Sequence, residues 1–136
     1  MTFTDTGPLV ALLNRRDAQH AKCDAATNQL EPGPLLTTWP CVTEAMYLLY
    51  RSNGELGPQA LWEYISKELI ELVDLPLPVM SRMQDLMEKY VNVPMDLADA
   101  SLIAVAEARG IRKIFTLDGD FRIYRLADGT TLDLIP

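Results

Sequence analysis

Residues 97–121 read LADASLIAVAEARGIRKIFTLDGDF, and this stretch decides the fold. An apolar, alanine-rich run is followed by Gly110 and then by the short apolar segment KIFTL at 113–117. The first run predicts a helix from Pro94 to Arg109, because glycine commonly follows the end of a helix. KIFTL predicts a buried strand, since it is short and apolar. The same alternation of strand and helix extends along the rest of the chain.

The complete pattern predicts an α/β domain. Further strands are predicted at 1–5, 35–39 and 69–75, with 130–135 as a candidate edge strand. Further helices are predicted at 8–14, 18–30, 40–52, 58–67 and 78–90. Strands that alternate with helices form βαβ crossovers, which give a parallel sheet with both faces covered. We therefore predict one domain over residues 1–136, a three-layer α/β/α sandwich with a central mostly parallel sheet.

Length and composition restrict the class of protein. The chain has 136 residues, with 49% hydrophobic and 23% charged residues, as is ordinary for one globular domain. No apolar run reaches the roughly 18 residues that a membrane span needs, so no membrane partner is expected. The segment MTFTDTGPLV lacks the features of a signal peptide. Because two cysteines are too few for a disulfide framework, we expect a cytoplasmic protein with reduced thiols.

Acidic residues follow the predicted strands and open the predicted helices on one side of the sheet. Asp5 follows the first strand, and Asp118 follows KIFTL. Glu44 lies near the start of the helix after TTWPC, and Asp96 and Asp99 lie in the first turn of the helix before KIFTL. The carboxyl ends of parallel strands share one edge, where ligands bind. Helix capping explains one acid at a helix start, but it does not explain four segments that bring carboxylates to one edge.

Clustered carboxylates of this kind indicate a metal site. Like charges raise each other's pKa values and destabilise a fold unless cations compensate. An all-oxygen set without histidine or thiolate is typical of Mg²⁺ or Mn²⁺ rather than zinc. Such ions activate water and neutralise the charge of a phosphodiester during hydrolysis. The net charge of −7 argues against nucleic-acid binding through overall charge, unless some of these acids hold cations.

Three segments resemble the PIN-domain ribonucleases, especially the single-domain toxins of the VapC type. DTGPLVALLNRRD at 5–17 is similar to the family's opening strand, acid and helix, and TEAMYLL at 43–49 is similar to its helix with a single glutamate. Residues 97–121 resemble its most specific stretch, an Asp-Ala-x-x-Ile-Ala helix followed by a strand and Thr-x-Asp-x-Asp-Phe. The resemblance covers nearly the whole chain.

The resemblance implies that Asp5, Glu44, Asp99 and Asp118 form a catalytic, metal-binding site. In the family these acids bind a divalent metal, and water directed by them cleaves single-stranded RNA and leaves a 5′-phosphate. Asp99 matches the family aspartate better than Asp96, because it directly precedes the apolar part of the helix. The resemblance also implies a homodimer and an antitoxin partner, which lies across a groove near the helices at 40–52 and 58–67.

Supporting roles are open for four further residues. The family often has Asn or Ser where this chain has Gly7, and the hydroxyl of Thr6 is a candidate substitute. Asp96 is a candidate for capping or support rather than direct ligation. Asp120 is a ligand, a positioning acid or a turn residue. Thr116 is a candidate donor to a carboxylate or to a substrate phosphate.

The basic residues fall into two groups. Arg122 and Arg125 closely follow the acidic segment DGD, where they are placed to touch RNA phosphates. Arg109, Arg112 and Lys113 belong at the opposite edge of the sheet and are expected to be solvated.

Together with the metal site, the resemblance implies a metal-dependent endoribonuclease that acts on RNA, and two alternatives stand beside it. The first is a catalytically silent PIN-like module that binds metal, RNA or protein. The second is a phosphatase or phospho-receiver that uses Asp5 as nucleophile. This second alternative is weaker, because no second aspartate follows two residues on and no lysine follows the late strand.

Overall fold

A five-stranded sheet of order β3-β2-β1-β4-β5 forms the centre of the computed structural model, which describes residues 1–136. The strands are β1 (Thr2–Thr4), β2 (Leu35–Thr37), β3 (Ile70–Leu72), β4 (Lys113–Phe115) and β5 (Asp133–Ile135). The helices are α1 (Thr6–Leu13), α2 (His20–Ala26), α3 (Trp39–Asn53), α4 (Leu56–Ser66), α5 (Leu77–Lys89) and α6 (Leu97–Arg109). Short 3-10 helices η1 (Thr27–Gln29) and η2 (Gly119–Arg122) follow α2 and β4. Every pair of neighbouring strands is parallel, which confirms the predicted α/β class, and β5 is the expected edge strand.

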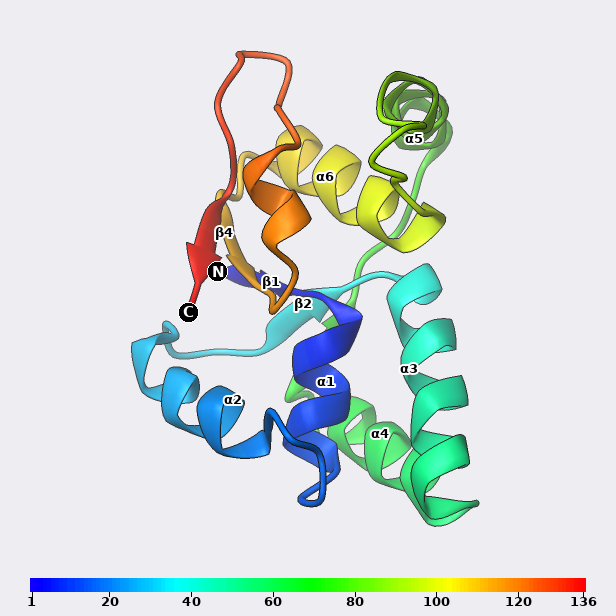
Figure 1. Ribbon diagram of the computed structural model, residues 1–136, viewed down its shortest axis with the longest axis vertical. Helices are drawn as coiled ribbons and strands as arrows, with labels where there is room; N and C mark the ends of the chain where they lie inside the picture. The colour runs from blue at the N-terminus through cyan, green and yellow to red at the C-terminus, as the bar shows by residue number, and fades with distance from the viewer.

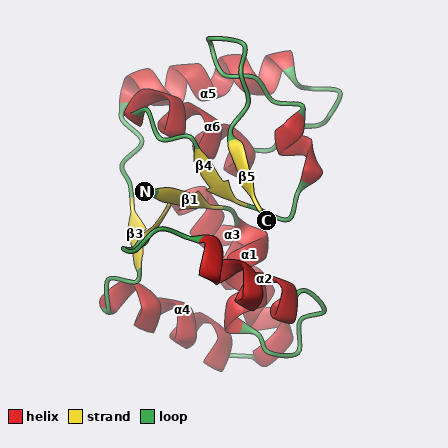
Figure 2. Cartoon of the chain, turned by 90° about the vertical axis from the view of Figure 1, so that its left-hand side faces the viewer, coloured by secondary structure: helices red, strands yellow, loops and turns green.

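The two faces of the sheet are covered by different helices, because successive strand residues point to opposite sides. Phe3, Leu36 and Ile114 are fully buried in the core shared with α5 and α6. On the other face Phe115 packs with α1 and α2, and Ile70 packs with α1, α3 and α4. Figure 1 shows α5 and α6 above the strands and α1, α2 and α4 below them. Figure 2 shows the strands between these two groups of helices, which confirms the predicted three layers.

Helix α6 is the most buried helix, and it carries Asp99, one of the predicted site residues, in its first turn. All of residues 98–106 are buried, and most of them are small or apolar, so the helix packs closely against the sheet and α5. It begins at Leu97 rather than at Pro94, because the extended Asp96 is its N-cap and accepts a 2.8 Å hydrogen bond from the backbone N–H of Asp99. It ends at Gly110 in the left-handed conformation, as predicted.

Gly57 is the point where α4 approaches α3 most closely. A Cβ atom at residue 57 would lie 2.3 Å from the carbonyl oxygen of Leu49, which is far inside the contact distance. We expect Gly57→Ala to lower the free energy of unfolding by about 2 kcal/mol or more, the usual cost of overpacking, as measured by urea denaturation. Gly7→Ala is the matched control, because a Cβ atom there meets only the Leu117 side chain, at 3.6 Å. Equal stabilities of the two variants would contradict the close helix contact.

Candidate active site

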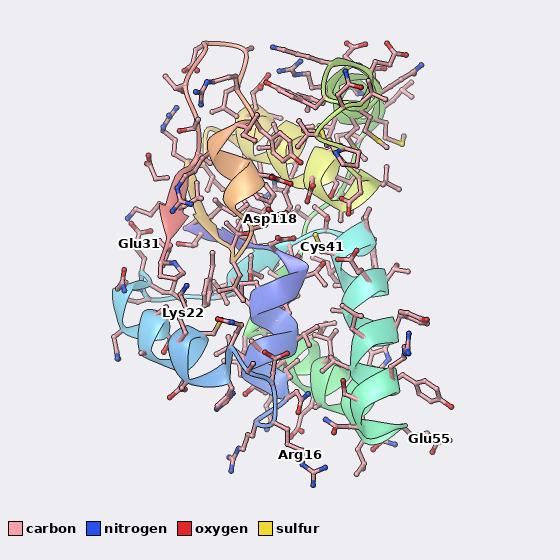
Figure 3. The ribbon with its side chains drawn as sticks, viewed as in Figure 1. Arg16, Lys22, Glu31, Cys41, Glu55 and Asp118 are labelled. Atoms are coloured by element: carbon pink, nitrogen blue, oxygen red, sulfur yellow. The ribbon has the colours of Figure 1, made fainter.

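The predicted acidic residues lie where the two central strands end. Asp5 directly follows β1 and is the N-cap of α1. Asp118, which is labelled in Figure 3, lies between β4 and η2 and caps η2. Asp99 is in the first turn of α6, and Asp96 is the cap of the same helix. Because β1 and β4 are parallel neighbours, their carboxyl ends bring these segments to one edge of the sheet.

Asp5 is a buried carboxylate that accepts two hydrogen bonds through its side chain. Only 7% of the residue is exposed. Its Oδ1 accepts a 2.8 Å hydrogen bond from the backbone N–H of Thr6, and its Oδ2 accepts a 3.0 Å bond from the hydroxyl of Thr116. Burial raises the pKa of Asp5 from 3.8 to about 6, and the charges of Asp118 and Glu44 add to the rise, while the hydrogen bonds oppose it.

Asp99 is buried to the same extent as Asp5, and its pKa is raised further. Its Oδ2 accepts a 2.9 Å hydrogen bond from the hydroxyl of Tyr124, which is itself fully buried. Burial raises the pKa of Asp99 from 3.8 to about 7, followed by the charge of Asp96. The hydrogen bond from Tyr124 lowers this pKa, and the charges of Asp5 and Asp118 raise it further. The mutual effects of Asp5, Asp99 and Asp118 mean that the structure brings these three carboxylates into one electrostatic cluster.

Thr116 connects two of the strand-end segments. Its hydroxyl donates to Asp5 and accepts a 3.0 Å hydrogen bond from the backbone N–H of Asp118. Asp118 in turn accepts a 2.9 Å bond from the backbone N–H of Asp120, whose own carboxylate makes no hydrogen bond in the structure. Asp120 is half-buried, and its charge contributes to a raised pKa of Tyr124, after burial and Asp99.

The structure places Glu44 and Thr6 differently from the buried acids. Glu44 is the sixth residue of α3 and is exposed, and it acts on Asp5 through its charge. The hydroxyl of Thr6 donates to the backbone carbonyl of Cys41, at 3.3 Å, rather than to a carboxylate. The backbone N–H of Thr6, and not its side chain, therefore supports Asp5.

No lysine or arginine forms an ion pair with this cluster. The acids in the five salt bridges of the structure are Glu31, Glu63, Glu107 and Asp128, and none of them belongs to the cluster. The side chains as placed do not bring three acidic, histidine or cysteine residues together tightly enough to hold a metal ion. The donors are nevertheless all carboxylate oxygens, two of them buried without a counter-charge, and this chemistry fits Mg²⁺ or Mn²⁺. Asp5, Asp99 and Asp118 are the residues that could hold such an ion, with Glu44 at the margin.

Sequence reasoning named Thr116 as a candidate donor to a carboxylate, which the structure confirms for Asp5, but it missed the group that holds Asp99 in place. Tyr124 carries the only side-chain hydrogen bond to the carboxylate of Asp99, and nothing in its sequence context indicates this role. The hydroxyls of Thr38 and Ser101 lie 2.6 Å apart and join the start of α3 to α6. Ser101 could have been noticed, since it is the one polar residue in the apolar run that follows Asp99.

A parallel α/β/α sandwich with uncompensated carboxylates at its strand ends is the arrangement expected of a domain that binds cations and acts on phosphates. The sequence profile of the PIN domain matches residues 2–126, and the chain belongs to this family. No curated protein matches the chain with significance.

Solved structures of VapC toxins share the fold. VapC20 of Mycobacterium tuberculosis, described as a sarcin–ricin loop cleaving toxin, superposes with a TM-score of 0.83, at 20% identity over 100% of both chains. A toxin–antitoxin complex from Klebsiella pneumoniae gives a TM-score of 0.68, at 18% identity over 89% of this chain and 90% of that one. VapBC2 from Rickettsia felis, bound to a DNA fragment of its promoter, also gives 0.68, at 13% identity over 98% of each chain. No helix in the present structure is long and apolar enough to cross a membrane.

The raised pKa values predict an unusual pH dependence of stability. Because the folded state holds protons on Asp5 and Asp99 up to about 6 and about 7, it binds more protons than the unfolded chain above the ordinary 3.8. The free energy of unfolding in EDTA should therefore fall from about pH 4 to about pH 7, as measured by urea denaturation. Asp99→Asn should flatten this fall, while Asp85→Asn, at an exposed site on α5, should not. A stability that rises over the same range would contradict the burial of both acids.

Proposed function

We propose that this protein is a divalent-metal-dependent endoribonuclease that hydrolyses RNA phosphodiester bonds. The observation that carries the proposal is the pair of buried carboxylates, Asp5 and Asp99, which have no counter-cation at the strand ends of a PIN domain. Burial of such charges destabilises a protein unless a cation binds them. Two buried carboxylates at this position therefore favour a bound cation.

In the proposed site, Asp5, Asp99 and Asp118 hold Mg²⁺ or Mn²⁺, and Glu44 binds the ion or orients the attacking water. When bound, the ion supplies a water of lowered pKa and neutralises charge on the phosphate. Thr116 and Tyr124 orient the Asp5 and Asp99 carboxylates through the hydrogen bonds described above. Water adds to phosphorus and the bond to the 3′-oxygen breaks, so that the 3′-oxygen takes a proton and the other product keeps a 5′-phosphate.

The toxin role is supported by the solved relatives. VapC20 is described as a toxin that cleaves the sarcin–ricin loop, and the structure from Klebsiella pneumoniae is of a toxin–antitoxin complex. We infer that this chain is likewise the toxin of a toxin–antitoxin pair and acts in the cytoplasm.

One observation favours the silent module as a second candidate. The acidic side chains as placed do not form a compact ligand set. A PIN domain whose carboxylates fail to gather around an ion would bind RNA or protein without cutting it. Measurements of metal binding and cleavage on the same samples separate the two candidates.

The proposed function predicts that Mn²⁺ binding and RNA cleavage both depend on Asp99. We expect the native protein to bind Mn²⁺ in calorimetry and to cut a mixed pool of single-stranded RNA. Asp99→Asn should weaken Mn²⁺ binding at least about tenfold and reduce cleavage further, since it removes a charged ligand. Asp85→Asn is the control for net charge, because Asp85 is exposed on α5 and belongs to no site described here.

The two measurements distinguish the outcomes. Binding with no cleavage by the native protein would favour the silent module. A native protein that neither binds Mn²⁺ at millimolar levels nor cuts RNA would overturn the catalytic proposal. Equal behaviour of both variants would place the metal elsewhere.

Two surfaces support the proposed partners. An apolar cavity of about 500 Å³ lies between α1, the segment before β2, and α4; its lining includes Leu12, Leu30, Tyr64 and Leu69. We propose that an apolar segment of an antitoxin occupies it, and a short reading frame upstream of the gene would identify that protein. The aromatic side chains exposed on α3 and α4 form a separate surface: Tyr47, Tyr50 and Trp62. We propose that this surface joins two copies of the chain.

The proposed dimer predicts a change of mass after substitution on α3. Tyr47→Glu combined with Tyr50→Glu should convert a dimer to a monomer in sedimentation velocity, because charged residues at the centre of an apolar interface oppose association. Both tyrosines are more than half exposed, at 59% and 57%, so the fold should tolerate the change. Leu77→Glu, at an exposed site on α5, is the control. A native protein that is already monomeric, or a double variant that stays dimeric, would contradict this surface.

A further inference from the structure

A small cavity lies beside the acidic edge, on the side of α2. Its volume is about 80 Å³. Lys22 from α2 and Arg122 from η2 line it, together with Thr116 and Asp118 from the segment after β4. Figure 3 labels Lys22 on α2 and Asp118 near the end of β4. The cavity therefore shares Thr116 and Asp118 with the candidate active site and adds two cations to them.

The two cations have no partner within the protein. Lys67, Arg82, Arg112 and Lys113 form the side-chain ion pairs of the structure. The side chains of Lys22 and Arg122 form none and donate no hydrogen bond. Two unpaired cations on one cavity repel each other, and an anion between them would remove this repulsion. The arrangement stands out in a chain with a net charge of −7, in which 19 acidic residues outnumber 12 lysines and arginines.

The size of the cavity limits the ligand. A volume of about 80 Å³ is the space of roughly two to three water molecules. It is far below the roughly 300 Å³ at which cavities begin to take ligands of drug size, so it suits a small group. A single phosphate group fits, and the guanidinium of arginine and the ammonium of lysine are its usual protein donors.

We propose that Lys22 and Arg122 bind a phosphate of the RNA strand next to the phosphate that is cut. This inference rests on the proposed function. The reason is continuity, since Asp118 lies in the wall of the cavity and in the acidic cluster at once. A strand whose reacting phosphate lies at the acids would bring a neighbouring phosphate to the two cations. Lys22 and Arg122 then fix the position of the strand. They attract it locally, although the protein as a whole carries a net negative charge.

The test compares the double variant Lys22→Gln/Arg122→Gln with a control variant, Arg16→Gln. Arg16 is an exposed arginine beyond the end of α1, without an ion pair, and Figure 3 shows it far from Asp118. Binding of a short fluorescent single-stranded RNA is measured by anisotropy in EDTA, where no cleavage occurs, over a series of salt concentrations. Cleavage of the same RNA is then measured with Mg²⁺. We expect the double variant to bind RNA about tenfold more weakly, and its plot of log affinity against log salt to be less steep by about one. In cleavage KM should rise more than kcat falls.

The binding and cleavage measurements test the phosphate site and the proposed nuclease separately. RNA binding that needs Lys22 and Arg122 in a protein that cuts nothing would support the phosphate site and overturn the proposed nuclease. Cleavage by a double variant with native KM and native RNA affinity would overturn the phosphate site and leave the nuclease standing. Inorganic phosphate is the third probe, followed by chemical-shift changes in NMR spectra. Phosphate binding that is lost in the double variant while RNA affinity stays native would overturn the assignment to a strand and indicate a site for the free ion.

Discussion

The contact between Asp5 and the segment after β4 is the constraint on which the candidate site depends. The backbone N–H of Asp5 donates to the carbonyl of Phe115 at 2.9 Å, which extends the pairing of β1 and β4 by one residue. The Thr116 side chain then holds the Asp5 carboxylate from the neighbouring strand. Because the same hydroxyl accepts from the backbone of Asp118, a single threonine fixes two acids relative to the central strands. The position of these acids is therefore set by sheet pairing rather than by a mobile loop.

Burial of the acids makes this end of the sheet costly in free energy. Asp5 and Asp99 are buried where their charged forms are poorly solvated, and neighbouring carboxylates raise their pKa values further. A structural role would be met better by neutral residues such as the buried Thr38 and Ser101, whose hydroxyls bond to each other. Local destabilisation of this kind is typical of functional sites, and the large core around α6 offsets it.

The sequence predicted the order and type of the main elements, because their signals are local. Gly110 marks the end of α6, and apolar runs mark the strands. It also predicted which edge carries the acids, since parallel topology follows from alternation of strand and helix. It placed the start of α6 at Pro94, because a capping aspartate and a first-turn aspartate look alike without backbone angles. Tyr124 stayed hidden, since its contact with Asp99 spans 25 residues and depends on how η2 folds back over α6.

The distribution of charge resolves the apparent conflict between an acidic chain and the proposed RNA substrate. Long-range attraction of nucleic acid requires net positive charge, which this protein lacks. Binding at close range depends on a few charges only, since screening limits each to within about 10 Å at ordinary salt. At this edge, cations at the small cavity and acids at the strand ends lie side by side. A divalent cation held by the acids would neutralise two of their negative charges and would itself contact a phosphate, so this end of the sheet would attract a strand more strongly than the acidic remainder of the surface. Attraction of this local kind positions a strand without requiring a positive charge on the protein as a whole.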